Sequence, residues 1–248
     1  MAFLEKILHV VCLGIYVFVF STFIRNGEEN LKSTDPDVKI IGELNYRFLT
    51  NWTYGMQLLY YFLIVFSHLI GVVPALGKIS NKVRNLADIL FATIVIPFGL
   101  TVTISFWSLY AIDRELIYPS WIDKVIPLWM NHALHTFNSV LPLIDMVLCN
   151  HKFPSWSLSS ICILLYSLAY AVCFFGTYYT HGRWLYPMFH KLSNAEIGYY
   201  SLGNTALVFL LHAMARGFNH LIWGSSTVSK KTTGKQSKKS KQKTKKVA

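Results

Sequence analysis

Charged residues are scarce in this 248-residue chain: they make up 14% of it, whereas hydrophobic residues make up 53%. A soluble domain of this length normally carries about 25% charged residues. The charges also cluster between long charge-free runs, and a run of about 20 apolar residues matches the roughly 30 Å hydrocarbon core of a bilayer. The composition therefore predicts an integral membrane protein and argues against an ordinary soluble domain.

Paired cysteines are missing as well. The chain has four cysteines, none with the CxxC spacing of a metal or redox site. They fall in or beside apolar runs, at Cys12, Cys149, Cys162 and Cys173. We therefore expect them to be small apolar packing residues, and we predict neither a metal site nor a cofactor. No internal repeat is visible.

Long apolar runs are what the chain does have, and each is long enough to cross a bilayer as a helix. They cover residues 7–24, 48–74, 89–112, 126–149, 158–179 and 197–223. The first lacks the short core and cleavage site of a signal peptide, so we expect a retained helix. The predicted fold class is all-α: a polytopic transmembrane bundle of about six helices over residues 1–224, with a polar loop at 25–47 as its longest connection.

Basic residues predict the orientation of this bundle. Lys6, a short basic loop with Lys78, Lys82 and Arg84, then Lys152 and a lysine-rich tail fall on one side. The positive-inside rule places that side, and with it both termini, in the cytosol. The net charge of +11 comes mostly from the tail and does not indicate nucleic acid as a partner.

The tail at 225–248 is too polar to fold alone, so we predict that it is disordered. It would bind the anionic cytosolic leaflet with about 1 kcal/mol per lysine near the surface. Its last four residues, Lys245-Lys246-Val247-Ala248, fit the dilysine retrieval pattern of endoplasmic reticulum membrane proteins. The pattern favours the endoplasmic reticulum over the plasma membrane.

Ionisable residues inside apolar runs are candidate site residues, because such groups are costly in lipid and usually face a bundle interior or a cavity. The isolated histidines His68 and His212 are typical of hydrogen bonds between helices. Asp145 follows His135 at i+10, which is ~15 Å along a helix and ~80° around it. We therefore expect Asp145 to be a polar partner for another helix, or to reach the cytosolic headgroups, rather than to complete a triad with His135.

The fourth apolar run has a polar face. His132 and His135 lie at i and i+3, Asn131 lies at i−4 from His135, and Asn138 extends the face by another i+3 step. Three uses of this face are possible. It could be a metal site, although such a site would need more histidines, or it could bind haem through His135 and His68. It could also supply a catalytic base, because imidazole titrates near neutrality. The residues alone leave all three open.

Two sequence blocks resemble a known family. Residues 105–119 (SFWSLYAIDRELIYP) match the signature F-W-x-x-Y-x-x-D-R-E-x-x-Y-P, and residues 129–136 (WMNHALHT) match W-x-N-H-x-x-H-T. Over about residues 1–224 the chain therefore resembles the androgen-induced protein family, which includes androgen-dependent regulators of tissue factor pathway inhibitor.

The resemblance implies a membrane-embedded hydrolase that cleaves fatty acid esters of hydroxy fatty acids with a threonine nucleophile and a histidine, without a cofactor. By position in the family's motifs, the threonine is Thr50 and the histidine is His135. Thr53, in the polar stretch that follows Thr50, is a rival nucleophile. Asn131, His132 and Asn138 are candidates for orienting His135 or holding the oxyanion, together with backbone amides at the start of the second helix.

Topology supports the pairing, because the second and fourth runs both enter from the non-cytosolic side and so place Thr50 and His135 in the same leaflet. Arg114 is a candidate for binding a fatty-acid carboxylate, with a helix-end ion pair to Asp113 or Glu115 as the alternative. The expected partners are a branched fatty acid ester and the membrane; the oligomeric state is not predicted. The main rival function is a non-enzymatic scaffold or lipid-binding protein.

Overall fold

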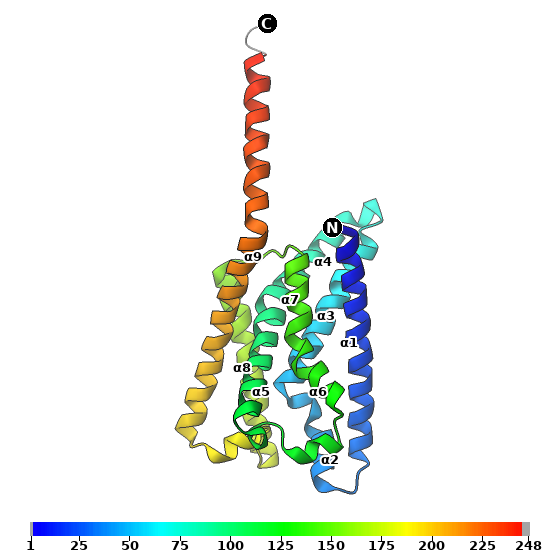
Figure 1. Cartoon of the computed structure of the whole chain (residues 1–248), viewed down its shortest axis with the longest axis vertical. Helices are drawn as coiled ribbons and strands as arrows, with labels where there is room; N and C mark the ends of the chain where they lie inside the picture. Colours follow the sequence, from blue (N-terminus) through cyan, green and yellow to red (C-terminus); the bar gives the residue numbers. More distant parts are fainter. Residues whose placement is uncertain (1, 245–248) are drawn as a thin grey trace.

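The computed structural model describes residues 2–244, and over that part of the chain it is a bundle of helices without strands (Figure 1). The long helices are α1 Ala2–Leu31, α2 Pro36–Leu44, α3 Leu49–Ile70, α4 Gly77–Leu90, α5 Ile96–Asp113, α6 Leu128–His135, α7 Phe137–Leu148, α8 Trp156–His181 and α9 Asn194–Thr244. Short turns of helix lie between them, namely η1 Asn45–Arg47, η2 Pro74–Leu76, η3 Phe91–Val95, η4 Arg114–Leu116, η5 Ser120–Lys124 and η6 Pro187–Lys191. The predicted all-α fold class is confirmed.

Among the residues that the structure describes, four helical stretches are long and apolar enough to cross a membrane: Phe3–Leu31, Leu49–Ile70, Pro74–Leu116 and Trp156–His181. The chain is therefore a multi-pass membrane protein, and the prediction of about six spans is confirmed for these four. The α6–α7 pair and α9 also run along the bundle (Figure 1). The former is broken into short pieces, and the apolar run of α9 is interrupted by polar residues such as Asn204, His212 and Arg216.

The start of α1 and the point where α9 leaves the bundle lie at the same end, which also holds α4 (Figure 1). We call it the α1-start end. The assignment of this end to the cytosol stays a prediction. Beyond residue 224, α9 continues as a helix to Thr244, whereas the sequence predicts a disordered tail there. A helix can continue in this way because, once it is nucleated in the bundle, each further residue adds one hydrogen bond. The division of the chain at residue 224 stays a prediction, and the dilysine pattern at 245–248 lies outside the described residues.

Two segments that were predicted as loops are helical. In the 25–47 segment α1 continues to Leu31 and α2 follows, with Pro36 in its first turn and the Asp35 carboxylate accepting a hydrogen bond from the Asp37 amide at 2.9 Å. The basic segment around Lys82 is α4. Hydropathy predicted the part of each helix that fits in lipid, but a helix can extend into water wherever its polar residues are solvated or capped.

A π-helical turn, η3, joins α4 to α5 just before Pro97. In this turn the Ile96 amide bonds to the carbonyl of Phe91, which leaves the Ala92 carbonyl free for another donor. His212 of α9 supplies that donor, with Nδ1 2.8 Å from the Ala92 oxygen. The prediction that His212 makes a hydrogen bond between helices is confirmed.

The predicted fourth helix is divided at Thr136 into α6 and α7. Within α7, Pro142 has no N–H to donate to the carbonyl of Asn138. Gln57 of α3 supplies the missing donor, because its Nε2 lies 2.7 Å from both the carbonyl and the side-chain oxygen of Asn138. Gly99 of α5 permits this close approach: a Cβ there would collide with the Asn138 carbonyl and lie 2.8 Å from Gln57 Nε2.

Candidate active site

A mostly apolar cavity of about 240 Å³ lies in the half of the bundle away from the α1-start end, which holds the start of α3 and α6 (Figure 1). Thr50, in the first turn of α3, and His135, the last residue of α6, both line it. The structure therefore brings the two residues together in one cavity, although they come from helices far apart in sequence. Much of the remaining wall is aromatic or aliphatic, for example Phe106 and Leu134.

The His135 ring is held in one orientation. Its Nδ1 lies 2.6 Å from the side-chain oxygen of Asn131 and 3.0 Å from the Asn131 carbonyl, and the ring stacks on Phe106 with centroids 3.6 Å apart. Because both Asn131 oxygens are acceptors, Nδ1 carries the hydrogen and Nε2 keeps its lone pair. Within residues 2–244 no hydrogen-bond partner occupies Nε2, so this atom is free to accept a proton.

The two candidate nucleophiles have different surroundings. The Thr53 hydroxyl is fully buried, lies 2.9 Å from the Thr50 carbonyl and 3.1 Å from the Leu49 carbonyl, and accepts a hydrogen bond from Asn138 Nδ2 at 3.2 Å. Thr53 does not line the cavity, whereas Thr50 does. For the part of the chain described, the Thr50 hydroxyl makes no hydrogen bond. The surroundings favour Thr50 over Thr53.

The start of α3, where Leu49, Thr50 and Asn51 line the cavity, has backbone amides without a helix carbonyl as partner. The Leu49 amide donates to the hydroxyls of Tyr170 and Tyr186 at 3.1 and 3.2 Å, and the amides of Asn51 and Trp52 donate to the Phe48 carbonyl. The Thr50 amide lies between them in the first turn, where no carbonyl of the helix can reach it. It is thus the amide at this helix end that remains for a ligand.

The other residues singled out on α6 and α7 do not line the cavity. Asn131 touches His135 directly, as described above. Asn138 bonds Thr53 and Gln57 rather than His135. His132 is exposed and stacks on Trp107 with centroids 5.1 Å apart. Of the three candidates for orienting His135 or holding the oxyanion, Asn131 alone therefore contacts the His135 ring.

Arg114 does not line the cavity either. Its guanidinium donates to the carboxylate of Asp123 at 2.9 Å and packs over the rings of Tyr110 and Tyr118. The alternative of a helix-end ion pair is therefore observed, but the partner expected from the sequence, Asp113 or Glu115, was wrong. Asp123 became the partner because the chain turns back through η5, a tertiary feature that sequence adjacency does not reveal.

A second group of polar residues is buried at the α1-start end. The Asp145 carboxylate, fully buried, accepts hydrogen bonds from His9 Nε2 at 3.1 Å and from the Tyr60 hydroxyl at 2.8 Å, and it lies 3.4 Å from His151 Nε2. His9 belongs to α1 and Tyr60 to α3, so the prediction that Asp145 is a polar partner for another helix is confirmed. His68, at the end of α3, bonds His9 Nδ1 at 3.0 Å, which likewise confirms its predicted bonding between helices.

The same group corrects two expectations. Cys149 was predicted to be an apolar packing residue, but its Sγ lies 3.6 Å from His9 Nε2, because the end of α7 meets α1 here. The haem pairing of His135 with His68 is also wrong: His68 is 18 residues beyond Thr50 on α3, about 27 Å along the helix, whereas His135 lies at Thr50's end. His9 itself was missed, although Glu5 and His9 stand at i and i+4 on one face of α1, a spacing that could have revealed it.

His151, in the connection between α7 and α8, is the titratable group of this region that lies outside the membrane-spanning segments. Burial would lower the pKa of its ring, but the carboxylates of Asp145 and Asp88, each 3.4 Å away, outweigh burial and raise the pKa to about 9. The ring also stacks on Phe91 with centroids 3.7 Å apart. At neutral pH His151 is therefore a buried cation paired with carboxylates.

Comparison with known proteins gives one consistent result. A family profile described as FAR-17a/AIG1-like protein matches residues 4–220. The androgen-dependent TFPI-regulating protein of Homo sapiens is 28% identical over 218 residues, which cover 88% of this chain and 93% of that protein. The androgen-induced gene 1 protein of Homo sapiens is 34% identical over 146 residues, which cover 58% of this chain and 60% of that protein. No solved structure matches the chain.

Proposed function

The chain belongs to the FAR-17a/AIG1-like protein family, and from this premise we propose that it is an intramembrane hydrolase that cleaves fatty acid esters of hydroxy fatty acids. The observation that carries the proposal is that Thr50 and His135 line one cavity. The substrate class comes from the sequence resemblance. The apolar wall of the cavity supports a lipid substrate, because a buried acyl chain needs such a wall.

In the proposed reaction, His135 Nε2 accepts the proton of the Thr50 hydroxyl while the hydroxyl oxygen attacks the ester carbonyl carbon. The bond to the hydroxy fatty acid then breaks, and its oxygen takes the proton from His135. An acyl-threonine remains. Water gives a proton to His135 and attacks the acyl carbon, the Thr50 oxygen recovers that proton, and the fatty acid leaves.

The negative charge that develops on the carbonyl oxygen needs a hydrogen-bond donor. The Thr50 amide is the best candidate, since its neighbours on both sides already have acceptors. It also lies at the N-terminus of α3, whose dipole favours an anion. Asn131 and Asn138, the side-chain candidates, do not line the cavity.

The size of the cavity bounds how the substrate would lie. Its volume of about 240 Å³ is below the ~300–1,000 Å³ of typical small-molecule sites. A two-chain lipid ester therefore cannot fit inside entirely. We propose that the cavity holds the ester group and part of one acyl chain, with the rest of the substrate in the bilayer.

We also propose that the α6–α7 pair and α9 are the further membrane spans. Both termini would then lie in the cytosol, and the protein would reside in the endoplasmic reticulum.

The direct test is hydrolysis of a branched fatty acid ester by the full chain in detergent, for wild type, Thr50→Ala, Thr50→Ser, Thr53→Ala and His135→Ala in parallel. We expect Thr50→Ala and His135→Ala to lose activity, by about 10²–10⁴-fold for the loss of the base. Thr50→Ser keeps a hydroxyl and should retain part of the activity. Thr53→Ala should retain kcat, because its hydroxyl is bonded elsewhere.

Thermal unfolding of each variant shows whether a loss of activity is a loss of fold. Full activity of a folded Thr50→Ala or His135→Ala protein would end the proposed assignment. The cavity also suits a non-enzymatic lipid-binding protein, and that function predicts a different result: wild type would bind the ester without hydrolysing it, and a serine-hydrolase activity probe would not label Thr50.

A further inference from the structure

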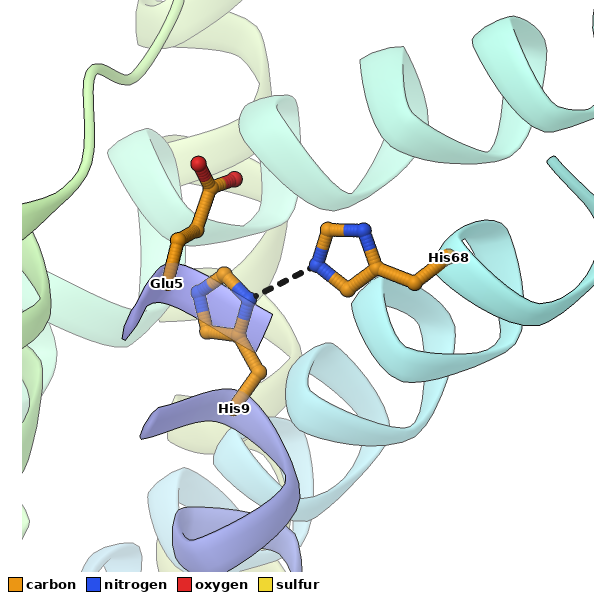
Figure 2. A group of neighbouring side chains, drawn as sticks. All are labelled: Glu5, His9 and His68. Atoms are coloured by element: carbon orange, nitrogen blue, oxygen red, sulfur yellow. Dashed lines mark hydrogen bonds between the residues drawn. The ribbon is translucent and has the colours of Figure 1, made fainter. Parts of the chain in front are cut away.

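Three side chains that can bind a metal ion meet at the α1-start end of the bundle, far from the cavity. Glu5 and His9 come from α1 and His68 comes from the end of α3, and Figure 2 shows the His9 and His68 rings facing each other with Glu5 one helical turn from His9. One ligand atom from each of the three lies within 4.8 Å of the others. Glu5 and His68 are half-buried, whereas His9 is 1% exposed.

Hydrogen bonding determines which lone pairs point into this space. Asp145 is a carboxylate, so His9 Nε2, 3.1 Å away, must be the donor. In a neutral His9 ring the other nitrogen, Nδ1, then carries a lone pair. This atom faces His68 Nε2 at 3.0 Å. If the His68 hydrogen moves to Nδ1 of its own ring, two nitrogen lone pairs face the same point.

The arrangement matches the ligand set of known transition-metal sites. Two imidazoles and one carboxylate bind Zn²⁺ in several enzymes, with an open fourth position, and a His ligand usually donates its other N–H to a carboxylate, as His9 does to Asp145. Zinc–nitrogen distances of 2.0–2.1 Å at a tetrahedral angle require about 3.3 Å between the two nitrogens. The observed 3.0 Å needs only a small opening.

We propose that Glu5, His9 and His68 form a binding site for a divalent transition-metal ion, with Zn²⁺ as the best fit and Asp145 as the residue that orients His9. The site departs from the expectation, drawn from the sequence, that the chain has no metal site. It does not depend on the proposed hydrolase, because the cavity lies at the other end of the bundle. A bound ion would connect α1 to α3.

An alternative ligand set lies on the opposite side of the same ring, where His9, Asp145 and Cys149 also bring ligand atoms within 4.8 Å of one another. All three side chains are buried, and Asp145 already accepts hydrogen bonds from His9 and Tyr60. A metal there would have to displace these bonds. The Glu5 side is therefore favoured, because Glu5 and His68 are partly exposed.

One cation already stands beside the site. Arg84 of α4 donates to Glu5 Oε1 at 2.6 Å, and its charge opposes a second cation. The carboxylate keeps its other oxygen, Oε2, for a metal, and it offsets the Arg84 charge. Arg84 would thus orient the Glu5 carboxylate that binds the metal. We expect Arg84→Gln to alter affinity less than removal of a ligand.

The test is Zn²⁺ titration of the full chain, purified in detergent with an affinity tag that lacks histidine and stripped with a chelator. Wild type should bind one Zn²⁺ per chain, and Zn²⁺ should raise its unfolding temperature. Mg²⁺ should do neither, because imidazole ligands do not suit it. Co²⁺ in place of Zn²⁺ should give the visible absorption of a four-coordinate site.

The variants separate the ligands from their surroundings. Asp145→Asn should weaken binding by roughly 10–100-fold, the usual cost of losing an outer partner, and His68→Gln and Glu5→Gln should each cost more than that. The matched control is His190→Gln, an exposed histidine of η6 on the cavity side of the bundle. Cys149→Ser should bind as wild type does.

Each outcome decides the proposal. One Zn²⁺ per wild-type chain, lost in His68→Gln and Glu5→Gln proteins whose unfolding without metal matches wild type, supports it. The proposal is overturned if wild type binds no stoichiometric Zn²⁺. It is also overturned if His68→Gln and Glu5→Gln both bind Zn²⁺ with the affinity of wild type. A thiolate-to-Co²⁺ band in the near ultraviolet that disappears in Cys149→Ser would overturn the assigned ligand set in favour of the opposite side of His9.

Discussion

The two ends of the bundle bury polar side chains in opposite ways. At the α1-start end, Asp145, His9, His68 and Tyr60 are joined by hydrogen bonds between α1, α3 and α7. At the other end, Thr50 and His135 line a cavity of about 240 Å³. Polar groups inside a bundle are costly unless they are bonded. The bonded end therefore suits a structural role, and the end with free groups suits chemistry.

The difference also shows how one residue type serves two purposes. His9 uses both ring nitrogens on side-chain partners, so that its ring connects helices. His135 uses one nitrogen on Asn131 and keeps the other for the cavity. A histidine in an apolar run thus becomes a candidate base when it lines a cavity and its environment leaves one ring nitrogen unused. Mutations at each end, and a change of pH, test this contrast.

The largest effect is expected from Asp145→Ala. Removal of the carboxylate leaves the Tyr60 hydroxyl without its acceptor and the buried His151 cation with one carboxylate, Asp88, instead of two. Stability should therefore fall by about 3–5 kcal/mol. Thermal unfolding in detergent measures it, with Asp123→Ala as the control because that carboxylate is 54% exposed. If Asp145→Ala unfolds at the wild-type temperature, the polar end does not hold the bundle together.

The second effect is the pH dependence of stability. Folding raises the pKa of His151 from about 6.5 to about 9, so its contribution is complete below about pH 6.5 and is lost as pH rises through 9. The groups that face the ring are Asp145, Asp88, Tyr60 and Phe91, whereas Asn219 bonds the backbone of His151. We expect wild type to lose on the order of 1–3 kcal/mol over this window.

Unfolding temperatures from pH 6 to pH 10 measure this loss, and His151→Gln should flatten the profile because glutamine does not titrate. Parallel profiles for wild type and His151→Gln would show that the buried cation is not the source.

The third effect concerns the cavity end. Asn131→Ala removes the closer of the two acceptors that hold the hydrogen on His135 Nδ1. We expect kcat to fall by roughly 10–100-fold with KM and stability nearly unchanged, because a part of the contribution of the base is lost while its nitrogen remains. Asn131→Asp, which keeps a side-chain acceptor, should recover activity. An unchanged kcat in Asn131→Ala would remove Asn131 from the positioning role.

The smallest effect is expected from Arg114→Ala. The Arg114–Asp123 ion pair is partly exposed, with side chains 29% and 54% exposed, and such pairs contribute at most about 1 kcal/mol. Because Arg114 does not line the cavity, hydrolysis should continue at the wild-type rate. A large rise in KM for esters with a free carboxylate would return Arg114 to the site as a carboxylate-binding residue.

The sequence predicted some of the contacts between helices, and the reason is the cost of polar groups in lipid. It predicted that Asp145 and His212 bond to other helices, and both do. It also predicted that Thr50 and His135 share a depth, from counting which end of each run they occupy. Such predictions need only the chain's order and the bilayer's thickness.

The missed features all depend on which helix faces which. No pattern of residues predicts that Cys149 lies beside His9 or that Arg114 pairs with Asp123. It likewise did not show that His132 turns to Trp107 while His135 turns to Phe106. The basic residues of α4 do not belong in lipid, so hydropathy predicts a loop there, although these residues are compatible with a helix.

Hydropathy along the chain is enough to predict that it enters the membrane as helices, because the free energy of transfer into lipid adds up residue by residue along a run. Which polar groups are bonded and which remain free depends on how the helices pack. A hydrogen bond requires two atoms from distant segments to meet within about 3 Å, and the packing of helices around Gly99, Pro142 and Gln57 determines where that occurs.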